Sequence, residues 1–171
     1  MKSNIIDDLR KLAIDISTLQ FDAANARKHN PKNIEAIKSS LAQFGQRKPI
    51  VVQRDGMIVR AGNGTLEAAR ALGWSEIAAV VIDEDGTKAA QFAIADNRTA
   101  ELAEWDKETL ATLLDSMDEH DREIIGFSVE DVQEILGSIS ADFDPGTIED
   151  QSRLDEKSPI TCPECGHEFT K

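Results

Sequence analysis

The stretch Ala61-Gly62-Asn63-Gly64-Thr65 joins a segment that favours a β-strand to a run with helical spacing. The apolar segment 57–59 precedes it, and Leu66, Ala69 and Leu72 follow it at the spacing of an amphipathic helix. Where a strand enters a glycine turn that opens a helix, backbone N–H groups and the helix dipole favour an anion. Glycine tolerates positive φ and lets a phosphate approach the backbone. The turn therefore predicts a phosphate-binding site, and a plain tight turn is the alternative interpretation.

The chain before this turn predicts a strand, a connector and a helix. Alternating Leu12, Ile14 and Ile16 favour a first strand, after which residues 21–27 resemble an irregular connector. Asn30 is a good N-cap, Pro31 suits the first helical position, and Gly45 ends the run. The apolar face of this helix is formed by Ile34, Ile37, Leu41 and Phe44.

A hairpin and further helices are expected around the turn. Asp55-Gly56, between Pro49–Gln53 and Met57–Val59, is the strongest short-range hairpin signal. Three helices are expected to begin near Thr87, Asp106 and Ser128, the last ending at Gly137. The β-branched run within residues 76–83 predicts a buried strand between the hairpin and these helices.

Charge is distributed unevenly along the 171 residues, whose net charge is -13. Residues 1–100 carry a small positive excess, whereas residues 101–134 and 135–171 are strongly acidic. Basic residues expected around the candidate site are Arg27, Lys28, Lys32, Arg47, Lys48, Arg54, Arg60 and Arg70. A nucleic-acid partner for the first half therefore stays open despite the acidic total, with a solvated basic surface as the alternative.

The order of these features resembles the ParB N-terminal (ParB/sulfiredoxin) superfamily over roughly residues 12–117. The residues 95–98, Ala-Asp-Asn-Arg, followed by residues 101–106, are similar to the compact ParB-like domains of phages and mobile elements, often found beside or fused to DNA methyltransferases. The resemblance implies an α+β fold with a small mixed β-sheet and flanking helices, followed by a helical extension and a flexible tail.

The domain organisation that we expect has five parts. They are an N-terminal extension (1–11), the ParB/sulfiredoxin-like domain (12–117), a helical extension (118–137), an acidic linker (138–160) and a zinc-knuckle-like tail (161–171). The resemblance also implies a nucleoside triphosphate held by the glycine turn.

In relatives the turn carries arginines, for which Gly64-Thr65 stand here, while Asn63 replaces an acid or histidine. Arginine supplies the best bidentate phosphate clamp, so hydrolysis of a triphosphate is not simply implied. We expect Gly62, Asn63, Gly64 and Thr65 to contact phosphate, with Arg60 supplying charge.

Two further motifs match the family pattern. Asn25 and Arg27 match the connector, whose arginine faces the site in relatives. Asp96-Asn97 match the motif that approaches the metal and phosphates, and carboxylate and amide oxygens suit Mg²⁺. The resulting catalytic candidates are Asp96, Asn97 and Glu67, with a solvated helix end as the alternative for the first two. Sulfiredoxin chemistry is excluded because the turn lacks a cysteine.

The C-terminal segment Cys162-Pro163-Glu164-Cys165-Gly166-His167 has the spacing of a zinc knuckle. Tetrahedral zinc needs four ligands, so His167 could be the third, and a symmetry-related cysteine pair in a homodimer could complete the site. A redox pair and an inert tail are the alternatives.

These observations lead to three functional hypotheses. The first is a nucleotide-phosphate-binding module that acts on DNA or regulates a DNA methyltransferase or another phage protein. The second is a Mg²⁺-dependent nucleotide hydrolase, nuclease or small-molecule kinase on the same fold. The third is an acidic protein-interaction module. The absence of a long apolar segment argues against a membrane partner, and two cysteines in one C-x-x-C fit the cytoplasm.

Overall fold

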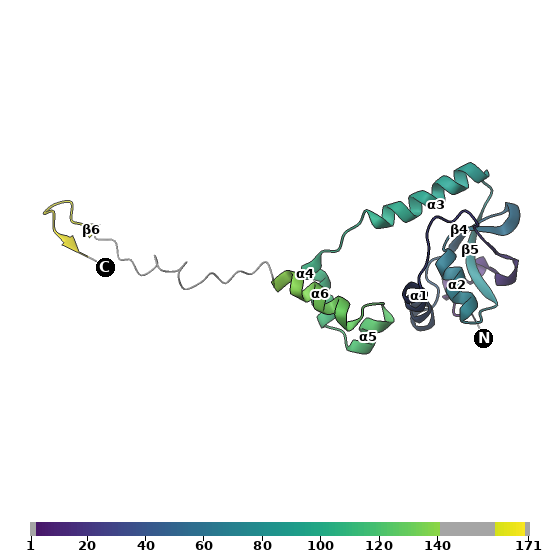
Figure 1. The fold of residues 1–171 in the computed structure, drawn as a ribbon, viewed down its shortest axis with the longest axis horizontal. Helices are drawn as coiled ribbons and strands as arrows, with labels where there is room; N and C mark the ends of the chain where they lie inside the picture. Colours follow the sequence, from purple (N-terminus) through teal and green to yellow (C-terminus); the bar gives the residue numbers. More distant parts are fainter. Residues whose placement is uncertain (1–2, 141–159, 170–171) are drawn as a thin grey trace. The chain divides into compact units, whose positions relative to one another are not determined.

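The computed structural model describes residues 3–140 and 160–169 (Figure 1). The chain divides into two compact units, Met1–Ile135 and Leu136–Lys171. Within the described ranges, no helix is both long and apolar enough to cross a membrane.

A five-stranded mixed sheet forms the centre of the first unit. Its strands are β1 (Ala13–Asp15), β2 (Gln20–Phe21), β3 (Ile50–Gln53), β4 (Ile58–Ala61) and β5 (Glu76–Ile82). Their order is β1-β5-β3-β4-β2, with β3 parallel to β5 and antiparallel to β4. The predicted α+β class, with a small mixed sheet and flanking helices, is therefore confirmed.

Six α-helices lie within the described residues, and those that follow Asn30, Asp106 and Ser128 begin where these residues predict. They are α1 (Pro31–Phe44), α2 (Asn63–Ala71), α3 (Gly86–Glu101), α4 (Lys107–Asp115), α5 (Glu119–Ile124) and α6 (Val129–Ser140), with short 3-10 helices η1 (Asp7–Leu12), η2 (Ile16–Thr18) and η3 (Asp55–Met57). The Asn30 side chain caps α1 by accepting from the Asn33 amide at 2.8 Å, and Gly45 follows with φ 72°. Asp106 caps α4 in the same way. Asx caps of this kind satisfy amides that the helix leaves without partners.

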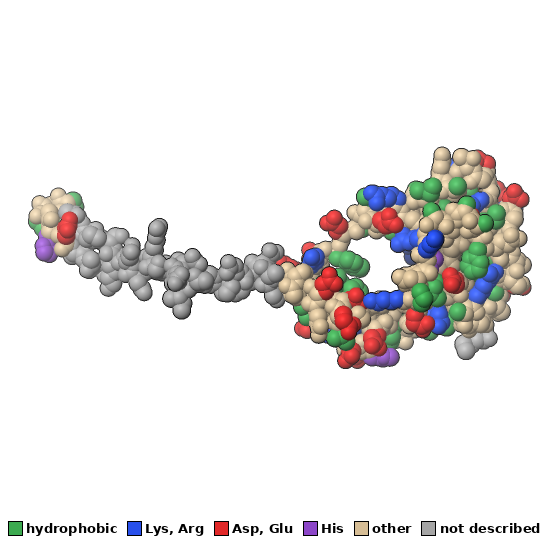
Figure 2. Space-filling model, in the orientation of Figure 1, with side chains coloured by type: hydrophobic (Ala, Val, Ile, Leu, Met, Phe, Trp, Pro, Cys, Tyr) green, Lys and Arg blue, Asp and Glu red, His purple; other side chains and the backbone are tan. Residues whose placement is uncertain are grey.

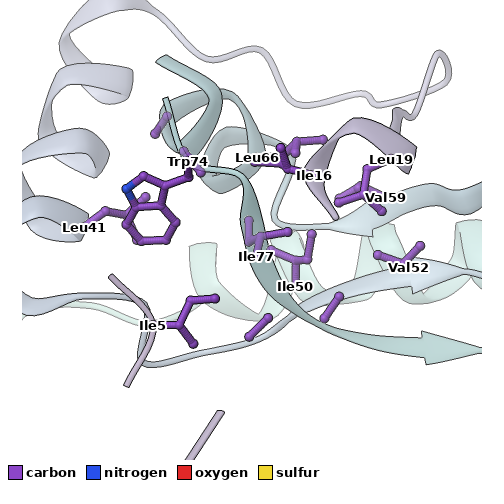
Figure 3. Close-up of a cluster of buried hydrophobic side chains, with 14 residues drawn as sticks. Ile5, Ile16, Leu19, Leu41, Ile50, Val52, Val59, Leu66, Trp74 and Ile77 are labelled. Atoms are coloured by element: carbon purple, nitrogen blue, oxygen red, sulfur yellow. The ribbon is translucent and has the colours of Figure 1, made fainter. Parts of the chain in front are cut away.

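The main core lies between the sheet and helices α1 and α2 (Figure 3). Its fully buried members include Val52 and Val59 from the hairpin, Ile77 from β5 and Leu66 from α2. Because Leu66 is the first apolar residue after the glycine turn, its burial fixes how α2 leaves the sheet. The predicted hairpin is confirmed, with Gly56 at φ 71° in its turn.

A smaller apolar cluster joins α4 to α6 within the first unit through Leu110, Leu114 and Val132. One hydrogen bond ties α6 to α1, because Lys32 donates to Asp131 at 2.9 Å. Figure 2 shows many acidic side chains over α4–α6, as the charge distribution predicts.

Two boundaries differ from the sequence-based expectation. The first strand is limited to β1, because the Asp15 side chain accepts from the Ser17 amide at 2.8 Å and begins η2. The expected end of the last helix at Gly137 is wrong. Gly137 is not among the positive-φ residues, so α6 continues through it to Ser140. Of the expected linker, residues 141–159 lie outside the described residues.

Among the short elements that were not expected, one strand and one α-helix lie in the first unit. β2, a strand of two residues where the expected connector begins, pairs in parallel with β4. Arg70 holds this segment by donating to the Leu19 carbonyl at 2.7 Å and by lying 4.8 Å from the centroid of the Phe21 ring. The second missed element is α5, whose six residues are too few to show a clear period.

A candidate phosphate-binding site

Gly62 has the positive φ that a glycine turn predicts, whereas Asn63, Gly64 and Thr65 belong to the first turn of α2. Gly62 lies at φ 94° and ψ 28°, and a Cβ atom there would lie 2.5 Å from Ile50 Cγ2. The helix begins at Asn63, earlier than the apolar spacing indicates. No side chain caps its start, and Leu66 donates the first intrahelical hydrogen bond, to the Gly62 carbonyl at 2.9 Å. The amides of residues 63–65 thus open a helix whose positive end is left without a side-chain cap.

Buried polar contacts support this turn from below. The Arg60 guanidinium donates to Asp22 at 2.7 Å and to Gln53 Oε1 at 2.6 and 2.9 Å. The side chains of Arg60 and Asp22 are only 10% and 9% exposed. Asn63 donates to the Val59 carbonyl at 3.0 Å and accepts from the Asp22 amide at 3.3 Å. We call these four residues, Asp22, Gln53, Arg60 and Asn63, the base of the turn.

The connector reaches α3 on the open side of the turn. Arg27 donates to Asn97 Oδ1 at 3.2 Å and lies 3.6 Å from Glu101. Asn25 accepts from the Arg27 amide at 3.1 Å, a local turn that orients the arginine. Asn97 is anchored in turn, because its amide group donates to the Ala93 carbonyl at 2.8 Å. The exposed Arg27 side chain (44%) is therefore positioned by weak contacts.

His29 approaches the turn directly, and sequence analysis missed it. A Cβ atom on Gly64 would lie 2.8 Å from His29 Cε1, so the missing side chain leaves room for the imidazole. His29 Nδ1 lies 2.6 Å from Asn33 Oδ1 on α1. A signal existed in the chain order, since His29 stands two residues after Arg27 and directly before the Asn30 cap. We call Asn25, Arg27, His29 and Asn97 the rim of the turn.

Two neighbouring cavities surround the rim. The smaller, about 210 Å³, is lined by Arg27, His29, Asn97, the glycine turn and Thr65, among others. The larger, about 430 Å³, lies between the connector and α3, and its apolar lining includes Ala26, Ala90, Ala93 and Ile94. Asn25, Arg27 and Asn97 line both cavities. A small polar cavity thus adjoins a wider, more apolar one.

The predicted site residues are only partly brought together. Arg27, Asn97 and the turn residues 62–65 line the smaller cavity, as does Arg60, whose guanidinium is engaged by the base. Asp96 and Glu67 are exposed and line neither cavity. Asp96 and Asn97 do not end a helix, because α3 continues to Glu101 and turns the two side chains in different directions. The solvated state that the alternative expects fits Asp96, which is exposed.

The C-terminal knuckle belongs to the second unit. β6 (Ile160–Thr161) pairs antiparallel with β7 (Glu168–Phe169) around the turn that carries both cysteines. Hydrogen bonds from the backbone amides of Cys165 and Glu164, and from the Cys165 thiol, lower the pKa of Cys162. In the described part of the chain, no three His, Cys, Asp or Glu side chains are grouped to hold a metal ion. Zinc binding therefore remains a prediction.

Comparisons with solved structures place this fold beside known ones. A chromosome-partitioning protein ParB from Caulobacter crescentus, C-terminally truncated and complexed with CTP-gamma-S, is similar with a TM-score of 0.60 and 21% identity, over 83% of this chain and 82% of that one. The sulfiredoxin of Arabidopsis thaliana has a TM-score of 0.40 and 18% identity, over 48% of this chain and 93% of that one. No curated protein matches the sequence.

The sequence itself matches the model of one family. That model is described as the ParB N-terminal domain, and the match spans residues 6–98. It begins just before η1 and ends within α3, so it contains the whole sheet, the glycine turn and the rim. Since the match covers more than half of the chain, the protein belongs to the ParB N-terminal domain family.

Proposed function

We propose that the glycine turn and its rim bind the phosphates of a nucleotide, and that this module acts on DNA or regulates a DNA-modifying partner. The observation that supports this proposal best is the cavity of about 210 Å³ at the start of α2, where no side chain caps the helix. Arg27, at the end of the connector, and His29, two residues later, line this cavity. Backbone amides at a helix start bind anions well, and an arginine adds a charge-assisted hydrogen bond.

The adjoining cavity suits the remainder of a nucleotide. Its alanine-rich lining and its volume of about 430 Å³ fall in the range of small-molecule sites, and its walls share Asn25, Arg27 and Asn97 with the smaller cavity. In this arrangement the phosphates lie over Gly62–Thr65, while the nucleobase and the sugar of the nucleotide lie between the connector and α3. The ParB structure with CTP-gamma-S makes cytidine triphosphate the first nucleotide to test.

Arg27 is free to exchange its partners for a phosphate. Its contact with Glu101 spans 3.6 Å between side chains that are 44% and 51% exposed, and such a surface pair contributes little. A multiply charged phosphate is the stronger acceptor. Loss of a hydrogen bond to a charged group costs about 1.5–3 kcal/mol. We therefore expect Arg27→Ala to weaken nucleotide binding about tenfold or more.

The test is a thermal-shift panel of CTP, ATP, GTP and UTP, with and without Mg²⁺, followed by calorimetric titration of any nucleotide that raises Tm. A ligand that binds only the native state raises Tm. Arg54→Ala is the matched control. Arg54 is an exposed arginine of the hairpin that pairs with Asp83, and it lines neither cavity. Equal nucleotide affinity in Arg27→Ala and Arg54→Ala would contradict the proposed site.

The proposed DNA role is supported by the charge of the first hundred residues, which contrasts with the acidic second half. Binding through lysine and arginine releases counterions, so affinity for duplex DNA should fall steeply as salt rises. The measurement is a titration of labelled duplex at several salt concentrations with and without the nucleotide. A DNA-modifying partner from a phage or mobile element remains a prediction, tested by co-purification from a host that carries one.

A Mg²⁺-dependent enzyme is the second candidate, and Asn97 is its strongest residue because it lines both cavities. Asp96 and Glu67 would have to be brought to the nucleotide by a movement of α3 or by a partner. Phosphate release or DNA nicking that depends on Mg²⁺ and is lost in Asn97→Ala would support this function. Nucleotide binding without turnover would contradict the enzyme and would support the nucleotide-binding module.

A further inference from the structure

The C-terminal hairpin presents two thiols on one closed turn. Cys162 donates its amide hydrogen to the His167 carbonyl at 2.9 Å, and the Gly166 amide donates to the Cys162 carbonyl at 2.9 Å. Gly166 lies at φ 74°, a conformation that a glycine adopts without strain. Cys162 and Cys165 both lie in the turn that connects β6 to β7. Neither cysteine is in a disulfide.

This turn supplies only half of a zinc site. Structural zinc is bound by four tetrahedral ligands, usually thiolates and imidazoles. The chain contains two cysteines in all, and within residues 3–140 and 160–169 no third His, Asp or Glu joins them. His167, although it follows closely in sequence, contributes its backbone carbonyl to the turn. Two ligands must therefore come from outside this turn.

We propose that two copies of the chain share one Zn²⁺, bound by Cys162 and Cys165 of each copy. A second copy supplies the same turn, so a two-fold axis through the ion completes a Cys₄ site with identical geometry from both sides. Four thiols lose four protons as the ion binds, and the four thiolates and Zn²⁺ form a complex of charge -2.

The experiment uses the full chain, purified with reductant and loaded with zinc. Metal analysis should find about one zinc per two chains, and native mass spectrometry should find that zinc only in dimers. X-ray absorption should count four sulfur ligands at about 2.3 Å from the metal. Cys162→Ser and Cys165→Ser should each lose the zinc and the zinc-dependent dimer.

His167→Ala is the matched control, because it removes the imidazole and keeps the backbone carbonyl that closes the turn. Zinc content and dimerisation should be unchanged in this variant. One zinc per chain, a loss of zinc in His167→Ala, a Cys162–Cys165 disulfide that excludes the metal, or no zinc binding would each overturn the proposal. Nucleotide binding measured on Cys162→Ser separates this result from the proposed function, since the glycine turn lies in the other unit.

Discussion

The base and the rim of the glycine turn use the same kinds of residue for different ends. At the base, Arg60 is 10% exposed and its guanidinium is satisfied by Asp22 and Gln53. At the rim, Arg27 is 44% exposed and makes a single hydrogen bond to a side chain, that of Asn97. A buried, fully paired arginine cannot leave its partners without leaving a charge unpaired, whereas an exposed one can. The difference fits a base that maintains the fold and a rim that is available to the ligand we propose.

The largest expected effect is at Gly62, which joins the base to the helix. In Gly62→Ala the new Cβ meets Ile50 Cγ2 at 2.5 Å, and alanine disfavours φ 94°. Left-handed strain and overpacking together should lower the free energy of unfolding by about 3 kcal/mol or more. Urea denaturation measures this loss. Gly86→Ala is the control, because nothing lies within 4 Å of a Cβ there and its stability should not fall.

The next effect should come from breaking the buried ion pair. Asp22→Ala leaves Arg60 with Gln53 as its remaining partner, so the free energy of unfolding should fall by about 3 kcal/mol. Asp83→Ala breaks the exposed pair with Arg54 and should cost under about 1 kcal/mol. If denaturant titrations give equal losses for the two variants, burial does not decide how much an ion pair contributes to the stability of this fold.

A smaller effect on stability is expected at Gly64, on the rim side. In Gly64→Ala the Cβ meets the His29 ring at 2.8 Å, but this half-buried side chain can rotate away, so the cost should stay within about 1 kcal/mol. Nucleotide affinity should fall more than stability, because the displaced ring enters the cavity. Calorimetric titration of the variant measures nucleotide affinity, and urea denaturation measures the free energy of unfolding. Adding His29→Ala should remove the clash and recover stability. Unchanged nucleotide affinity in Gly64→Ala would contradict a role for His29 beside the bound nucleotide.

The smallest effect concerns an exposed contact that supports structure. The Lys32 side chain, followed by the Ser128 amide and hydroxyl, lowers the pKa of Asp131 below its ordinary value of 3.8. A carboxyl with a lowered pKa in the folded state adds stability above its unfolded pKa and loses it as pH falls through the folded value. Stability should therefore decline below about pH 4, and less steeply in Asp131→Asn. Stability measured between pH 6 and pH 2 with the same slope in both proteins would contradict this.

Local signals predicted the secondary structure well wherever one residue type enforced a backbone state. Asn30 and Gly45 limit α1, and Asp55-Gly56 turns the hairpin, because caps and left-handed glycines act over three or four residues. Gly137 shows the limit of such signals. A glycine ends a helix only if it adopts positive φ, and here α6 continues through it.

The candidate site was less predictable than the fold. The glycine turn and Arg27 were expected, and both line the smaller cavity. Arg60 was expected to supply charge to phosphate, yet its partners are Asp22 and Gln53, which are distant in sequence. Whether a basic side chain is available depends on which acids the fold brings beside it, and spacing along the chain does not contain that information.

The sequence alone determined the α+β class, the family resemblance, the glycine turn and the acidic second half, because these depend on local conformational preference and composition. Only the tertiary structure decided which residues form the base and which the rim. His29 lies over Gly64, and Asp22 pairs with Arg60, because the sheet and α1 bring together segments tens of residues apart. Burial then fixes the roles, since an ion pair removed from water must stay paired while an exposed side chain can exchange its partner.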